Sequence, residues 1–412
     1  MGLFLSLAGW VRTHSKRTLV YRQLLSAMWA RWLYTLLLRI WMIQGLVLGI
    51  TGHYYSPSRR RLVPSRVLHW YSWLMMLATL ALYWGYWLYA QDYFVQGTFR
   101  RHGFVQSLSY GTVVLQLIAL VVQTVLRMFR EQEVCAVFNE LMAMRSTVSR
   151  VHPQGQPSRF YYVVFFGRLF NYLQNLNFSL SILLIVDMRS VSVWDYLSNF
   201  YFVYMSLVRD TLLMSYILLL LELGEVLRVN GEHPRTSYAG LMRQLQRQER
   251  LLRLVRRVHR LYAWQVLATM FFQLYFNMAT FYVGYSFLAA SSAPVSGFRV
   301  WNAKFLLTVL TFITKLFDGL LLQIVGERLL AQGNKPCAGP RVEDVTYMQA
   351  AQRQVSRPAG SPENRVLGMF AFDMRCAFAV ISCSLSYGII IMQLGIYPQL
   401  KPRPRSRHPA KC

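Results

Sequence analysis

Residues 386–398 read SYGIIIMQLGIYP and place one amide side chain, Gln393, within a run of isoleucine, methionine and leucine. Such a run is typical of a helix that lies inside a lipid bilayer. An unpaired amide in hydrocarbon costs a few kcal/mol, so Gln393 needs a polar partner or water beside it. What this helix faces is therefore the first question that the sequence raises.

The composition is that of a membrane protein. Hydrophobic residues make up 55% of the 412 residues and aromatic residues 15%, whereas Asp and Glu together number only 17. Apolar runs of about 20 residues, the length that crosses a hydrocarbon core of roughly 30 Å as a helix, recur along the chain. The net charge of +27 comes from arginines spread between these runs, which indicates membrane topology and not a nucleic-acid partner. We expect an all-α, polytopic membrane protein without a separate soluble domain.

Seven apolar runs predict transmembrane helices. In chain order they cover residues 68–90, 105–127, 161–186, 198–221, 264–290, 303–326 and 374–397. An eighth apolar stretch, residues 32–50, carries Arg39. Three alternatives remain open for this stretch, because it can cross the bilayer, lie in the interface or pack beside the bundle.

The distribution of Lys and Arg predicts the orientation, because cytoplasmic segments retain basic residues. If residues 32–50 do not cross, one side of the membrane receives the N-terminal region and the connections after the second, fourth and sixth helices. This side holds 30 Lys and Arg with Arg127 counted at its boundary, and the opposite side holds 9. We therefore expect the N-terminus inside the cell and the C-terminus outside.

The predicted organisation follows from these helices and this orientation. It comprises a cytoplasmic N-terminal region 1–67, helices one to four in 68–221, a cytoplasmic connection 222–263, helices five and six in 264–326, a cytoplasmic loop with a pre-pore helix in 327–373, helix seven in 374–397 and an extracellular tail 398–412. Within the connection, apolar residues recur at helical spacing among arginines, as in a basic amphipathic helix. Such a helix either lies on anionic lipid or packs against other cytoplasmic helices.

Motifs of enzymes are absent from the sequence, which has no glycine-rich phosphate loop, no HExxH and no GxSxG. We expect no enzymatic activity, no cofactor and no metal site. The ionisable residues at membrane depth are Arg168, Arg209, Asp210, Lys315 and Asp318. Lys315 and Asp318 stand three residues apart and can pair on one helix face. We interpret these charges as internal ion pairs, because no third carboxylate or histidine extends them into a relay for transport.

Polar residues form a stripe on the last predicted helix. At 100° per residue, four of them lie within about 40° of Gln393: Arg375, Ser382, Ser386 and Tyr397. Ile389 and Ile390 lie on either side of the stripe and interrupt it with hydrocarbon. The stripe either forms hydrogen bonds with a neighbouring helix or faces water.

The last helix resembles the seventh-helix signature of insect gustatory receptors, which is Thr-Tyr, five mostly hydrophobic residues and Gln-Phe. Here Ser386-Tyr387 is followed by five residues and by Gln393-Leu394, so that the tyrosine and the glutamine match at the same spacing. Ser386 and Leu394 replace Thr and Phe and keep the character of each position. Residues 48–66, LGITGHYYSPSRRRLVPSR, also resemble the Leu-Gly, aromatic and basic segment that precedes the first helix in these receptors.

The resemblance implies a taste receptor that is a ligand-gated, non-selective cation channel in the plasma membrane of gustatory sensory neurons. It implies a homo- or hetero-tetramer with other gustatory receptor subunits, in which the seventh helix of each subunit lines a central pore. The pore-lining candidates are Ser382, Ser386, Ile389, Ile390, Gln393 and Tyr397. The expected partners are the lipid bilayer and a small, fairly apolar tastant of the bitter class.

The resemblance also places the ligand among the outer halves of helices three to six, where aromatic and polar residues suit a small apolar molecule. The candidate walls are Tyr201, Tyr204, Tyr282, Tyr285 and Trp301, with Asn177 and Asn302 as hydrogen-bond partners.

Two other classes of membrane protein are alternatives to a gustatory receptor channel. A G-protein-coupled chemoreceptor requires an extracellular N-terminus, which the charge distribution opposes. A solute transporter requires broken helices and internal symmetry, which the sequence does not show.

Overall fold

In the computed structural model of the chain, the described residues are 32–33, 35–56, 58–59, 61–90, 103–151, 157–185, 193–232, 238–291, 298–333, 365–366, 370–371 and 374–400. Long helices dominate these ranges. They are α2 (Arg66–Ala90), α3 (Gly103–Val151), α4 (Arg159–Ile185), α5 (Val193–Glu232), α6 (Tyr238–Ser291), α7 (Phe298–Gly333) and α9 (Met374–Leu400). Each predicted transmembrane run lies within one of them, except for residue 186, which is outside the described ranges. The predicted all-α class is therefore confirmed.

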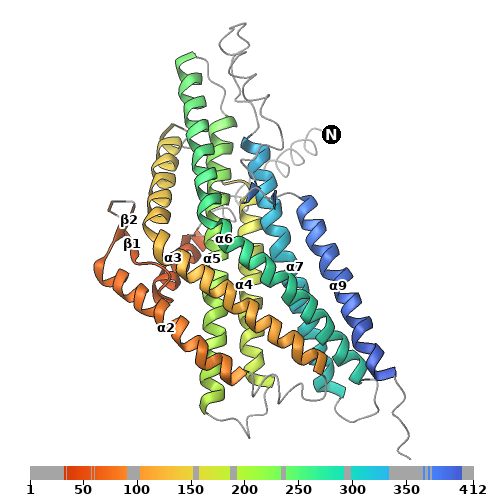
Figure 1. Cartoon of the computed structure of the whole chain (residues 1–412). Coiled ribbons are helices and arrows are strands. Elements are labelled where there is room, and N and C mark those ends of the chain that lie inside the picture. The colour runs from red at the N-terminus through yellow and green to blue at the C-terminus, as the bar shows by residue number, and fades with distance from the viewer. Residues whose placement is uncertain are drawn as a thin grey trace, which may run out of the picture.

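Three of the helices are too long for a bilayer alone. The lengths of α3, α5 and α6 are 49, 40 and 54 residues, whereas about 20 residues span the hydrocarbon core. Their extensions lie at one end of the bundle, together with the end of α7, at the top of Figure 1. We call this end the basic end, because it contains the arginine-rich connection of the sequence.

The amphipathic connection is the first half of α6, and it packs against other helices. Its apolar residues Leu251, Val255 and Val258 are buried in the main hydrophobic core, together with residues of α3, α5 and α7. Of the two alternatives for this segment, the structure therefore shows packing on neighbouring helices. Its arginines lie mainly on the surface, where Arg253 pairs with Glu249 at 2.7 Å.

The apolar N-terminal stretch packs beside the bundle. Its helical part, Thr35–Val47, is about 20 Å long at 1.5 Å per residue, which is shorter than the hydrocarbon core. The ring of Trp41 meets the ring of Tyr172 in α4 edge to face at 5.1 Å. Gln44 donates a hydrogen bond of 3.2 Å to Thr211 in α5. These contacts favour the third alternative for residues 32–50.

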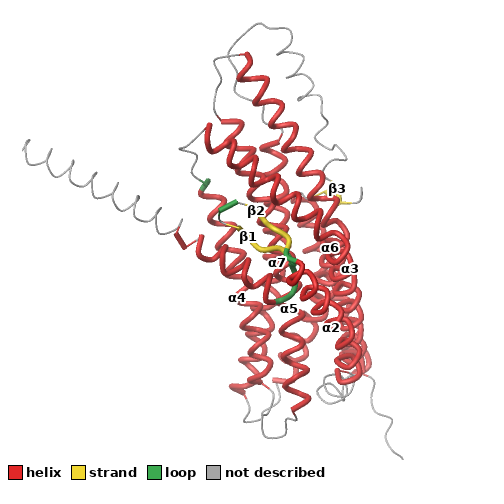
Figure 2. The backbone as a smooth tube through the Cα atoms, turned by 90° about the vertical axis from the view of Figure 1, so that its left-hand side faces the viewer, coloured by secondary structure: helices red, strands yellow, loops and turns green. Residues whose placement is uncertain are grey.

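A β-hairpin joins the N-terminal stretch to α2, and no sequence pattern predicted it. Strands β1 (His53–Ser56) and β2 (Arg61–Pro64) pair antiparallel, with His53 opposite Pro64. Gly49 precedes the hairpin at a φ of 70°, and a Cβ there would lie 2.5 Å from Cβ of Met75. Only glycine fits this turn without strain. Figure 2 shows the hairpin on the outside of the bundle, beside α2.

A second small sheet lies before the last helix. Strands β3 (Arg365–Val366) and β4 (Phe370–Ala371) pair antiparallel. They fall within residues 327–373, where the sequence predicted a pre-pore helix. In this region the structure describes only these strands and the end of α7 at Gly333, so most of the predicted helix lies outside the described residues.

Hydropathy identifies only part of the bundle as membrane-spanning. Within the described ranges, Tyr110–Val148 and Val309–Gly333 are long and apolar enough to cross a bilayer, and Phe378–Ile391 is a shorter apolar helix. The other long helices carry Trp, Tyr and buried polar side chains among their apolar residues, which lowers their hydropathy.

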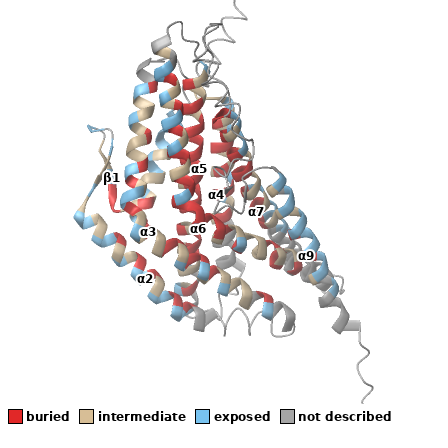
Figure 3. Ribbon diagram, turned by 45° about the horizontal axis from the view of Figure 1, so that its top comes forward, coloured by how far each residue is buried: buried red, intermediate tan, exposed pale blue. Residues whose placement is uncertain are grey.

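Burial distinguishes the central helices from the peripheral ones. In Figure 3, α5 and the middle of α6 are mainly buried, whereas α2 and α9 are exposed along much of their length. Tyr216, Ile217 and Leu220 of α5 have almost no exposed surface. The core is therefore built around α5, and α9 lies at the edge of the subunit.

We predict that epitope tags at the N-terminus and between residues 232 and 238 are cytoplasmic, and that a tag after Pro398 is extracellular. The reason is the excess of Lys and Arg at the basic end. Antibody binding to intact and permeabilised cells measures this. Staining of the 232–238 tag in intact cells would contradict the orientation.

Candidate functional site

The last helix, α9, has one packed face and one exposed face. Ser384 and Gly388 are buried, and they stand four residues apart on the side that packs against α6 and α7. The predicted polar stripe lies on the other side, where Ser382, Ser386 and Gln393 are all exposed. In the described part of the chain, these three side chains are therefore not buried by their own subunit. In a single chain, Gln393 is open to whatever surrounds α9.

The hydrophobic residues next to the stripe are also exposed. Ile389 and Ile390 are each 47% exposed, and Tyr387 of the signature is 54% exposed. The side chains of Leu394 and Tyr397 lie outside the described part of the chain. The exposed face of α9 thus combines polar and large apolar groups, as expected of a surface that other subunits and water cover.

A close contact at Gly388 sets how near α9 approaches α6. A Cβ at this position would lie 2.8 Å from Cδ1 of Phe281 in α6, which is closer than real side chains approach. Phe281 in turn lies against Phe312 of α7, with ring centroids 5.5 Å apart. The absence of a side chain at Gly388 therefore lets the last helix pack directly on these aromatic rings.

Buried charges tie α4, α5 and α7 together at membrane depth. Arg168 of α4 has no exposed surface and donates a hydrogen bond of 2.6 Å to Asp318 of α7. The same carboxylate accepts a hydrogen bond of 2.7 Å from Asn171. Lys315 of α7 lies 4.0 Å from Asp210 of α5. The structure thus confirms internal ion pairs.

The partners within this network differ from the predicted pair. Lys315 and Asp318 were expected to pair along one face of α7, but each has its partner on a different neighbouring helix. Arg209 lies 3.8 Å from Asp210 and also sits 4.6 Å from the ring centre of Phe272 in α6. The network therefore connects four helices and not one.

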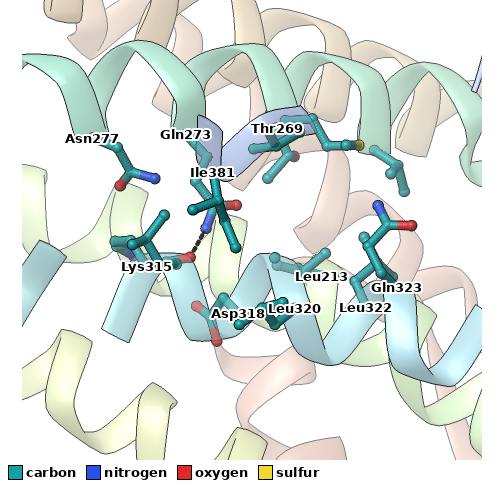
Figure 4. A pocket seen from close by; sticks show the side chains of 15 residues that line it. Leu213, Thr269, Gln273, Asn277, Lys315, Asp318, Leu320, Leu322, Gln323 and Ile381 are labelled. Atoms are coloured by element: carbon teal, nitrogen blue, oxygen red, sulfur yellow. Dashed lines mark hydrogen bonds between the residues drawn. The ribbon is translucent and has the colours of Figure 1, made fainter. Parts of the chain in front are cut away.

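A small cavity of about 30 Å³ separates this network from α9. Figure 4 shows it between α6 and α7. The labelled lining residues include Thr269, Gln273, Asn277, Lys315, Asp318, Gln323 and Ile381. Gln273 donates a hydrogen bond to the backbone carbonyl of Lys315, so α6 contacts α7 directly beside the cavity. Ile381 enters the lining from α9 and brings the last helix to the same place.

The candidate ligand residues that are described fall into two groups. Tyr201 and Tyr204 of α5 face α2, where Tyr201 donates a hydrogen bond to the carbonyl of Thr79. Tyr204 donates one of 3.0 Å to the carbonyl of Leu48. Tyr282 of α6 is buried in a separate cluster with residues of α3 and α9. The structure therefore does not bring these three tyrosines to one wall. The side chains of Asn177, Tyr285, Trp301 and Asn302 lie outside its described part.

A polar cluster beneath the hairpin was missed by the sequence analysis. Glu131 of α3 is buried and lies 2.9 Å from Nδ1 of His53 and 3.1 Å from Nδ1 of His69. It also accepts a hydrogen bond from the amide of Gly52. His53 lies in β1, His69 lies in α2, and Glu131 follows in α3. The three residues have no recognisable spacing in the sequence, so only the fold shows this contact. Among the described residues, no group of three or more His, Cys, Asp or Glu is arranged to hold a metal ion.

Comparison with known proteins identifies the family. Residues 36–397 match a family model described as "7tm Chemosensory receptor". The chain belongs to this family of chemosensory receptors. It is 47% identical over 372 residues to "Putative gustatory receptor 10b" of Drosophila melanogaster, which covers 88% of this chain and 98% of that protein. The receptor is thus a member of the insect gustatory receptor family, as its last helix predicted.

Solved structures with the same fold come from olfactory receptors. The receptor resembles olfactory receptor OR5 of Machilis hrabei, solved alone and in complex with eugenol, with TM-scores of 0.56 and 0.55. The match to the eugenol complex covers 88% of this chain and 99% of that protein at 14% identity. At this identity the likeness shows the shared fold.

We predict that Asp318→Asn lowers the free energy of unfolding by about 3–5 kcal/mol, because it leaves Arg168 charged and unpaired in the core. The measurement is thermal unfolding of the purified receptor together with its surface expression. The double variant Arg168→Met/Asp318→Leu should recover most of the loss, because it removes both charges. Glu249→Gln, which breaks an exposed ion pair, is the control and should change little. Equal stability of Asp318→Asn and the control would refute the role of the ion pair.

We further predict that Gly388→Ala destabilises the packing of α9 by about 1–3 kcal/mol, because the new Cβ overlaps the ring of Phe281. Surface expression and ligand-evoked response per receptor should both decrease. Phe281→Ala in the same chain should restore them, because it provides the missing space. Cys383→Ala, on the exposed face of α9, is the control. A Gly388→Ala receptor with an unchanged response would show that α9 does not approach α6 this closely.

Proposed function

We propose that this receptor is a subunit of a ligand-gated, non-selective cation channel, and that α9 lines its pore. The observation that carries the proposal is the exposed polar stripe of α9, which faces away from the subunit that supports it. A helix exposed to lipid on this face would leave Gln393 unpaired in hydrocarbon. Water in a central pore removes this cost.

The proposed pore requires several copies of the chain around one axis. We propose a tetramer, either of this chain alone or with other gustatory receptor subunits. The exposed residues Phe378, Leu385 and Ile390 of α9 supply apolar surface for contact between neighbouring copies. Four copies of Gln393 then form a ring of hydrated amides, and Tyr397 and the two serines extend the polar lining.

The gate of the proposed channel is apolar. Ile389 and Ile390 lie one turn from Gln393 toward the start of α9, and both side chains are exposed. A narrow ring of isoleucines excludes water in the closed state and blocks ions without a charged barrier. A rotation of α9 changes which isoleucine faces the axis, because the two side chains are 100° apart on the helix.

The proposed ligand is a small, fairly apolar molecule of the bitter class. The family resemblance suggests a site in the outer halves of helices three to six, with Asn177, Tyr285, Trp301 and Asn302 among its candidate residues. In support of a link to α9, α6 and α7 meet beside the small cavity that Ile381 of α9 lines. Tyr282 adds a contact, because its cluster contains Leu108 of α3 and Ile391 of α9. We propose the plasma membrane of gustatory sensory neurons as the location.

We predict that Gln393→Glu increases the permeability for cations, above all divalent ones, because it places a ring of negative charge in the ion path. Ile390→Ser should produce current without ligand, because a hydroxyl lets water enter the closed gate. Single-channel recording with surface labelling measures both effects. Gln246→Glu, the same substitution on the exposed surface of the basic end, is the control.

The competing role for Gln393 is a hydrogen bond to a neighbouring helix within the assembly. This role predicts that Gln393→Ala reduces assembled receptor at the surface and leaves the conductance of each channel unchanged. That result would overturn the pore assignment. Tastant-evoked current that disappears when G-protein signalling is blocked would overturn the channel itself.

A further inference from the structure

A large open cavity lies between the hairpin, the start of α2 and the middle of α3. Its volume is about 720 Å³, which is in the range of sites for small organic ligands. The charged and polar residues in its lining include His53, Arg61, Arg66, His69, Gln132 and Asn139. This cavity is separate from α9 and from the ion network at membrane depth, and the proposed channel mechanism does not use it.

Hydrogen bonds to α3 hold the hairpin in place and give the cavity a fixed shape. Asn139 accepts a hydrogen bond of 2.7 Å from the amide of Leu62 and donates one of 3.0 Å to its carbonyl. Arg127 donates one of 3.0 Å to the carbonyl of Ile50. Together with Glu131 beneath the first strand, these contacts fix both strands on α3.

The charge that remains in the cavity is positive. Burial raises the pKa of Glu131, but hydrogen bonds from His53 and Gly52 and the charge of Arg127 outweigh this effect and bring it to about 2. Burial lowers the pKa of His53, but its hydrogen bonds to Cys135 and Glu131 raise it to about 9. Glu131 and His53 thus neutralise each other. In the described part of the chain, neither Arg61 nor Arg66 has a carboxylate within ion-pairing distance.

The cavity lies close to large exposed apolar side chains of α2 and α3. Val67 and Trp70, in the first turns of α2, are 77% and 75% exposed, and Phe129 of α3 is 75% exposed. Exposed tryptophan beside apolar side chains is typical of the level of the lipid headgroups. Figure 1 shows the hairpin and the start of α2 below the extensions of α3, α5 and α6 at the basic end.

We propose that this cavity binds the headgroup of an anionic phospholipid of the cytoplasmic leaflet, one that carries phosphate monoesters. Arg61 and Arg66 supply planar guanidinium groups that bind phosphate oxygens through paired hydrogen bonds. Basic pockets on the cytoplasmic side of membrane helices are suited to such headgroups. The acyl chains then lie along the apolar face of α2 that begins at Val67. The proposal depends on the orientation of the receptor and not on the proposed pore.

The test is binding of a short-chain fluorescent phosphatidylinositol bisphosphate to the full-length receptor in nanodiscs of neutral lipid. Arg61→Gln/Arg66→Gln should weaken binding by about tenfold or more, because charge-assisted hydrogen bonds to phosphate are lost. Ala136→Trp should weaken it as well, because Ala136 is exposed in the lining and the indole occupies part of the cavity without changing the charge. Arg243→Gln/Arg250→Gln removes the same charge from the exposed surface of α6 and should retain binding.

Three results would overturn the proposal. Equal losses in the two double variants would assign binding to the general positive charge of the basic end. Unchanged binding by Ala136→Trp would place the headgroup outside the cavity. Equal affinity for the soluble inositol phosphate without acyl chains would assign the site to a free phosphate compound. The elution profile and the unfolding temperature of each variant verify that the loss of binding does not come from misfolding.

Discussion

The arrangement of this receptor depends on the ion pair between Arg168 and Asp318. Two charges at membrane depth are tolerated only when they meet, because an isolated charge there costs several kcal/mol. The pair therefore fixes which faces of α4 and α7 touch. Lys315 applies the same constraint between α7 and α5. Because these contacts fix the rotation of α7 about its own axis, its opposite face is exposed and carries Leu306 and Ile313.

The last helix is held by a different kind of contact. It packs through Gly388 against the ring of Phe281, and no ion pair joins it to the bundle within the described residues. Dispersion contacts of this kind are not directional, in contrast to a charged hydrogen bond. A rigid, charge-fixed group of α4, α5 and α7 therefore supports a helix whose own packing permits small changes in angle. This division suits a receptor in which ligand binding must move one element and leave the others in place.

The hairpin shows the same use of a buried carboxylate in a less apolar setting. Glu131 gathers two histidines and a backbone amide, and this attaches the chain before α2 to the middle of α3. Because the hairpin is pinned at both strands, it becomes part of the bundle and forms a wall of a cavity. In a flexible connection of the same length, the arginines would have no fixed position and would not line a cavity.

The sequence by itself determined the helices and their faces. The length of each apolar run and the spacing of its polar residues follow from the rise and the period of the helix, which are local properties of the backbone. They predicted α9 with its stripe through Gln393, and the apolar face of the connection that includes Val255, which is buried. The tertiary structure alone decided which faces meet. A spacing of three residues placed Lys315 and Asp318 on one side of α7. It contains no information about the helices beside them, and their partners proved to be Asp210 and Arg168.

Likewise, Tyr201 and Tyr282 each suit the wall of a ligand site. Only the packing of α5 on α2 and of α6 on α3 shows that the two tyrosines face different neighbours. Helical period specifies a direction around one axis, whereas a site requires the relative placement of several axes, and that placement arises from contacts between residues far apart in the chain.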